Sequence, residues 1–65
     1  MDLRKEYAKL YQLNQQLRKR YVEVTSREPI VATPRANPNS ITISLADYDM
    51  LNQQNLYLME LLSTL

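Results

Sequence analysis

An unbroken heptad pattern near the start of this 65-residue chain limits its fold more than any other feature. Apolar and amide side chains recur there at alternating spacings of four and three residues, and mostly helix-forming residues lie between them. Because this is the period of a helix that packs against another helix, we predict a helix over residues 2–24. The residues of this first seam are Leu3, Tyr7, Leu10, Asn14, Leu17, Tyr21 and Val24.

The end of the chain carries a second seam with the same period. Ser44 and Asp47 have the spacing of a capping box, so we predict a second helix over residues 45–65. From Leu56 onward apolar side chains surround this helix, and a helix that is apolar on every side needs cover on more than one side. The residues of the second seam are Tyr48, Leu51, Asn55, Leu58, Leu62 and Leu65.

The connecting segment, residues 25–44, contains three prolines and two β-branched runs. A structureless loop of this length is uncommon in so small a domain. We therefore predict a short β-hairpin with a strand at 30–33, a turn at 34–40 and a strand at 41–44. A disordered linker is the alternative.

The two predicted helices are similar in length, which favours an antiparallel helical hairpin with coiled-coil-like packing inside one chain. In this register Tyr7 faces Leu58, and the two seam asparagines lie in adjacent layers where they could form a hydrogen bond. A buried polar residue in a seam lowers stability but fixes the register. The residues expected to set the register are Asn14, Asn55, Arg20 and Asp47, the last two as an opposite-charge pair.

Composition narrows the range of functions. The chain has no Cys, His or Gly, so it lacks a thiol, an imidazole and a glycine-rich loop for phosphate. We expect a non-enzymatic protein with no catalytic residues, no cofactor, no metal and no small-molecule substrate. A chain of this size buries only about 60% of its surface on folding, and association with another chain is a common remedy. The sequence therefore predicts a mainly α, single small domain over residues 1–65 that is oligomeric.

The second helix is the expected site of association. Its excess apolar side chains predict an assembly, scaffold, adaptor or regulatory module whose partner is a second copy of itself or a larger protein. The predicted interface consists of Leu56, Leu58, Met59, Leu61, Leu62 and Leu65. The first residues alternate charged and apolar side chains, so no signal peptide is expected, and no apolar run approaches the roughly 20 residues that a membrane span needs. A cytoplasmic or otherwise intracellular location is therefore expected, without membrane partners.

Charge supplies the alternative function. Residues 1–28 carry seven basic and four acidic side chains, whereas residues 45–65 carry three acidic side chains and no basic one. Arg18, Lys19 and Arg20 could contact phosphates, which would suit a small dimeric nucleic-acid-binding regulator. The net charge of only +1 makes nucleic acid the weaker choice of partner.

Overall fold

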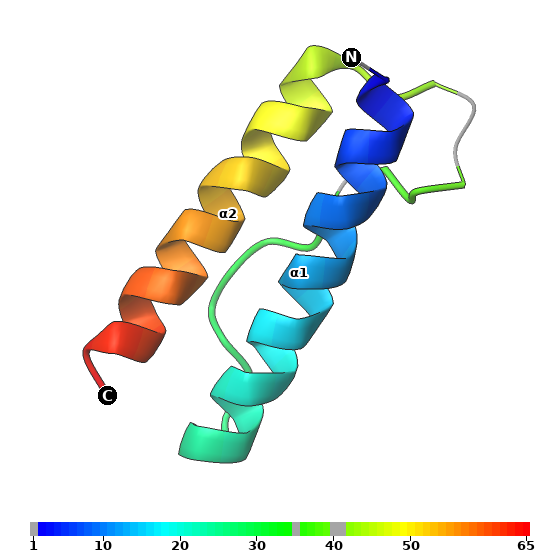
Figure 1. Ribbon diagram of the computed structural model, residues 1–65. Coiled ribbons are helices and arrows are strands. Elements are labelled where there is room, and N and C mark those ends of the chain that lie inside the picture. The colour runs from blue at the N-terminus through cyan, green and yellow to red at the C-terminus, as the bar shows by residue number, and fades with distance from the viewer. Residues whose placement is uncertain (1, 35, 40–41) are drawn as a thin grey trace.

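A computed structural model describes residues 2–34, 36–39 and 42–65 of the chain. It contains two helices, α1 (Leu3–Thr25) and α2 (Leu45–Ser63), which pack against each other (Figure 1). The prediction of a mainly helical chain with two packed helices is therefore confirmed.

Local hydrogen bonds explain where α1 begins and ends. The Asp2 side chain accepts from the backbone N–H groups of Arg4 at 3.1 Å and Lys5 at 3.4 Å, which caps the first turn. At the other end Ser26 adopts the left-handed conformation, with φ of 60°, and its N–H donates to the Val22 carbonyl. Glycine usually takes this position after a helix, but the chain has none. The helix is shifted by one residue from the predicted bounds.

The capping box at the start of α2 forms as predicted. The Asp47 N–H donates to the Ser44 hydroxyl at 3.2 Å, and the Ser44 N–H donates to the Asp47 carboxylate at 3.1 Å. These two bonds satisfy backbone donors that the helix itself leaves free, and they fix its first residue at Leu45. The helix ends at Ser63, two residues before the predicted end.

The two helices run in the same direction, so the predicted antiparallel orientation is wrong. Figure 1 shows α1 and α2 starting at the same end of the molecule. The side-chain bonds between the helices agree with this orientation, because Asn55 of α2 bonds to both Asn14 and the Leu10 carbonyl of α1, and the charge of Asp47 near the start of α2 acts on Tyr7 near the start of α1. The molecule is a helical hairpin only in the broad sense that one connection joins two packed helices.

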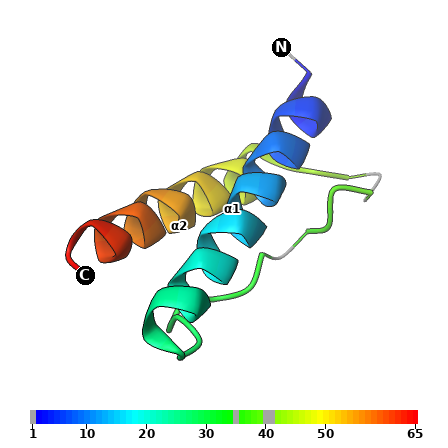
Figure 2. The same cartoon turned by 60° about the horizontal axis from the view of Figure 1, so that its bottom comes forward.

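The connecting segment returns along the helix pair instead of forming a β-hairpin. The turned view in Figure 2 shows it leaving the end of α1 and running back to the start of α2. Arg18 donates to the Ala32 carbonyl at 2.6 Å, the Tyr7 hydroxyl donates to the Ala36 carbonyl, and Pro29 is buried. Side chains of α1 thus take carbonyls that a second strand would otherwise pair.

Neither predicted strand is present among the described residues. Residues 30–33 and 42–44 are irregular, and Ile41 and Ser40 lie outside the described residues. The described residues of the two β-branched runs, Ile30, Val31, Thr42 and Ile43, instead belong to the irregular return connection.

The buried core is small and lies along the contact between the helices. Tyr7, Leu51 and Leu58 are its buried apolar side chains, and the amides of Asn14 and Asn55 lie among them. The two asparagines are 41 residues apart. In a parallel pair with this offset, equivalent heptad positions of the two helices lie at the same level, so Leu51 lies level with Leu10 and Leu58 lies level with Leu17. The predicted antiparallel register instead places Asn14 opposite Leu51 and Tyr7 opposite Leu58.

Candidate interaction site

A buried hydrogen-bonded network crosses the middle of the helix pair. The Asn14 side-chain Nδ2 donates to Asn55 Oδ1 at 2.9 Å, and Asn55 Nδ2 donates to the Leu10 carbonyl at 3.0 Å. Both asparagines are almost completely buried. The predicted hydrogen bond between the two seam amides is therefore present, although in a parallel pair.

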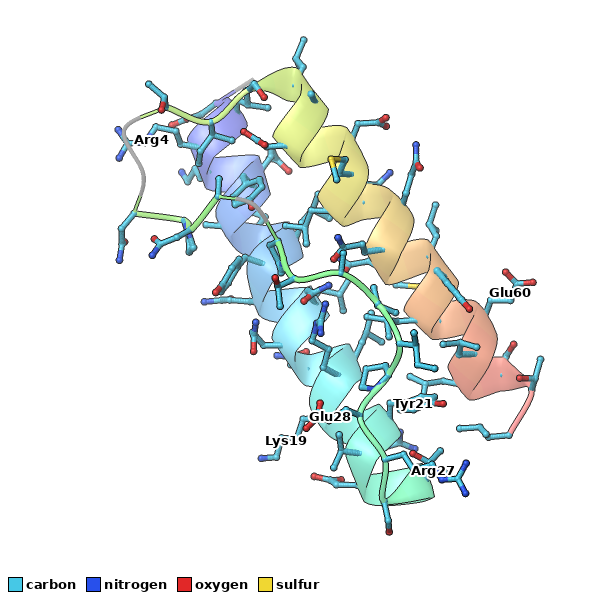
Figure 3. All side chains as sticks on the ribbon, turned by 180° about the vertical axis from the view of Figure 1, so that it is seen from behind. Arg4, Lys19, Tyr21, Arg27, Glu28 and Glu60 are labelled. Carbon is cyan, nitrogen blue, oxygen red and sulfur yellow. The ribbon has the colours of Figure 1, made fainter. Side chains whose placement is uncertain are left out.

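Arg18 extends this network to the connecting segment. Its Nε donates to Asn14 Oδ1 at 2.8 Å, and its Nη2 donates to the Ala32 carbonyl at 2.6 Å and lies 3.5 Å from the Val31 carbonyl. The guanidinium thus joins α1 to the return segment, and its link to α2 runs through the Asn14–Asn55 hydrogen bond. Figure 3 views the molecule from the side on which the segment crosses the helices. Nothing in the sequence marks this role, because the acceptors are backbone carbonyls.

The three basic residues predicted as phosphate contacts lie in different environments in the structure. Arg18 is directed toward its own chain, whereas Lys19 and Arg20 are exposed. Figure 3 shows Lys19 pointing away from the helix pair. Of the predicted cluster of three, only Lys19 and Arg20 are therefore free to contact phosphate.

Arg20 and Asp47 do not form the predicted ion pair. Asp47 caps the start of α2, while Arg20 lies exposed near the end of α1. Because the helices are parallel, these residues are at opposite ends of the molecule. Within the described residues the one ion pair joins Lys9 to Glu6 at 3.5 Å.

Tyr7 anchors the far end of the connecting segment. Its ring is buried, and its hydroxyl donates to the Ala36 carbonyl. Burial raises the pKa of the Tyr7 phenol above its ordinary value of 10.0, and the negative charge of Asp47 acts in the same direction. Tyr7 and Arg18 together hold the segment at two levels along α1.

The predicted interface on α2 separates into internal and external residues. Leu58 is fully buried against α1, and Leu61 and Leu62 are half-buried. Leu56, Met59 and Leu65 are exposed, with 57%, 41% and 62% of their surface accessible. Leu58 is therefore part of the helix pair and is not free for another chain.

The exposed apolar residues of α2 continue a surface that begins on α1. Leu45, Leu56 and Met59 share one side of α2 by helical spacing, and this side is turned away from the connecting segment, which lies near Met50 and Tyr57. Figure 1 views the molecule from this side, with the segment behind the helices. We call this surface the open face; its residues are Leu10, Leu13, Leu17 and Val24 of α1 and Leu45, Leu56 and Met59 of α2.

Of the open face, the predicted interface included only Leu56 and Met59 of α2. Leu10 and Leu17 belong to the seam and were expected to face α2, but the small core leaves both half-buried. Which side of the pair remains uncovered depends on the path of the connecting segment. The heptad pattern carries no information on that path.

Residues 2–34, 36–39 and 42–65 offer neither a metal-binding cluster nor a membrane-spanning helix. No group of three or more potential metal-ligating side chains lies together there. None of the helices in the described part of the chain has the length and apolar character to cross a membrane.

Comparisons with models of protein families, with curated proteins and with solved structures find no match to this chain. Its function is therefore inferred from its own residues.

Proposed function

We propose that this chain is a non-enzymatic assembly module, a scaffold or adaptor subunit that associates with another protein chain through α2 by coiled-coil-type contacts. The observation that carries the proposal is the exposure of Leu56 and Met59 after α1 and α2 have paired. Contiguous apolar side chains on a small protein commonly mark a surface for another protein. Helix faces of this kind dock on other helices through residues spaced three and four apart.

The chemistry of the chain supports binding rather than catalysis. It offers no thiol and no imidazole, and its acidic side chains on α2 lie apart from one another. The use of Arg18 inside the molecule reduces the basic surface that nucleic-acid binding would require. Association with protein is the function that remains best supported.

The test compares two substitutions that add the same charge to exposed positions of α2. Leu56→Glu alters the open face, whereas Gln53 is exposed on the side of α2 nearer the connecting segment, so Gln53→Glu serves as the matched control. We expect the wild type and Gln53→Glu to associate in light scattering over a concentration series, or to retain a protein from an extract of the source cells. Leu56→Glu is expected to lose that association while keeping its helical circular dichroism.

The contrary result is equally definite. A wild-type chain that stays monomeric at every concentration, and that captures the same proteins as Leu56→Glu, would exclude the open face as an interaction surface. A steep, salt-sensitive affinity for random duplex that Leu56→Glu leaves unchanged would instead favour the nucleic-acid function.

A further inference from the structure

The basic excess of the N-terminal part of the chain and the acidic charge of α2 are not paired with each other in the helix pair. Residues 1–28 carry three more basic than acidic side chains, and α2 carries only acidic ones. Within the part of the chain that the structure describes, no ion pair joins α1 to α2. Complementary charges therefore remain on the outer sides of the two helices.

We propose that the open face binds a second copy of this chain, with α1 of each copy lying on α2 of the other. This inference rests on the proposed function and names its partner. The two open faces meet across a two-fold axis parallel to the helices, which gives a four-helix bundle with the two connecting segments on the outside.

Symmetry fixes the register of this dimer. Rotation about an axis parallel to the helices leaves the level of every residue unchanged, so α1 meets the second copy's α2 with the same 41-residue offset as its own α2. Arg20 then lies level with Leu61 of the second copy and beside its Glu60. At the other end, by the same offset, Lys9 lies beside Asp49 of the second copy.

Each of these contacts joins opposite charges, and the symmetry produces each of them twice. Arg20 and Glu60 are exposed, and neither side chain has a hydrogen bond or ion pair to another described residue. Figure 3 shows Glu60 at the outer edge of α2. The charged rim therefore favours this orientation of the second copy while the leucines and Met59 of the open face supply the apolar contact.

An antiparallel arrangement of the two copies is electrostatically less favourable than the parallel one. If the two-fold axis crossed the helices, α1 would lie on α1 and α2 on α2. Glu6 would approach Arg20 of the second copy, but Asp49 would approach Glu60 of the second copy, because the acidic helices would face each other. Attraction on one side of such a dimer would be offset by repulsion on the other.

A charge exchange between Arg20 and Glu60 tests the proposal. We expect the wild type to be a dimer by light scattering and sedimentation. Arg20→Glu and Glu60→Arg should each weaken the dimer about tenfold or more at low salt, because two attractive contacts become repulsive. The double variant Arg20→Glu/Glu60→Arg should restore the dimer, with all four proteins equally helical by circular dichroism.

The outcomes separate this inference from the proposed function. A dimer that the double variant does not restore, or that neither single variant weakens, would overturn the contact of α1 with α2. A monomeric wild type would overturn the second copy as partner. The proposed function would still stand in that case if the chain captured a different protein and Leu56→Glu abolished the capture.

Discussion

Asn14 is the residue on which most of the interior polar contacts converge. Its amide donates to Asn55 and accepts from Arg18, and all three side chains are linked in one network. A buried amide is tolerated only when its polar atoms are paired, because an unpaired one keeps the full cost of leaving water. The network therefore fixes the axial register of α1 relative to α2 and adds little to the free energy of unfolding.

Removing both amides should cost less stability than the two single removals added together. Asn14→Leu leaves the Asn55 oxygen without its donor and the Arg18 Nε without its acceptor, so we expect a loss of about 1–3 kcal/mol in the free energy of unfolding. Asn14→Leu/Asn55→Leu should be more stable than the sum of the two single changes predicts. Urea denaturation of the four proteins measures this coupling, and strictly additive losses would contradict the network.

The raised pKa of Tyr7 predicts a loss of stability in alkali. Below about pH 10 the phenol is protonated in both states, so its contribution to stability is constant. Above that pH the unfolded state releases the proton first, because the folded-state pKa is the higher one. The unfolded state then binds fewer protons, and stability falls as pH rises.

Tyr7→Phe isolates this effect from other alkaline titrations. The wild type should lose up to about 1.4 kcal/mol per pH unit through this group above pH 10, a loss that Tyr7→Phe should lack. Tyr57→Phe, at an exposed ring, should behave as the wild type does. Thermal unfolding at several pH values measures the difference, and identical pH profiles for all three proteins would exclude the Tyr7 phenol as its source.

At the scale of elements, much of the helical structure could be predicted from the sequence, and the connection could not. The heptad seams located both helices, and Ser44 with Asp47 located the start of α2, because these signals depend on neighbours in the chain. The orientation depends on long-range contacts. Either orientation brings Asn14 and Asn55 close together, so the amides did not decide it.

The length of the connecting segment was the available signal for a parallel pair. Its ends must be one helix length apart, and α1 has 23 residues, about 35 Å. An extended segment gains about 3.3 Å per residue, so the residues between the helices can cover that distance. The anchors Arg18 and Tyr7 could not be foreseen, because the carbonyls of Ala32 and Ala36 leave no mark in the sequence.

Shortening this segment should therefore prevent the helices from pairing. A replacement of residues 27–43 by about five Gly and Ser residues leaves, with Ser26 and Ser44, a connection that reaches at most about 25 Å, which is too short for a parallel return over the length of α1. We expect it to lose most of its cooperative thermal unfolding, whereas a Gly/Ser segment of the original length should retain the transition at a lower temperature. A stable short-loop variant would show that the helices can pair as an antiparallel hairpin.

At the scale of the whole molecule, the chain is a rod of 35 × 17 × 16 Å with a side covered by the return segment and an open face. This division gives the helix pair one surface free for association. Within the described residues no ion pair joins α1 to α2, so the charges on the outer sides of the helices are also available to another chain. The parallel orientation is thus the central structural claim, since the proposed contact of α1 with a second copy's α2 depends on it.

Distances between pairs of spin labels test this orientation most directly, and the absence of native cysteine makes the labelling simple. Lys5→Cys/Ala46→Cys and Lys19→Cys/Ala46→Cys place labels at exposed positions, diluted with unlabelled protein to suppress distances between copies. In the parallel pair, labels 5 and 46 lie at the same level and are close together. Label 19 lies about 21 Å further along the helix axis, so the distance between labels 19 and 46 should be much longer. The reverse order, with label 19 near label 46 and label 5 far from it, would contradict the account.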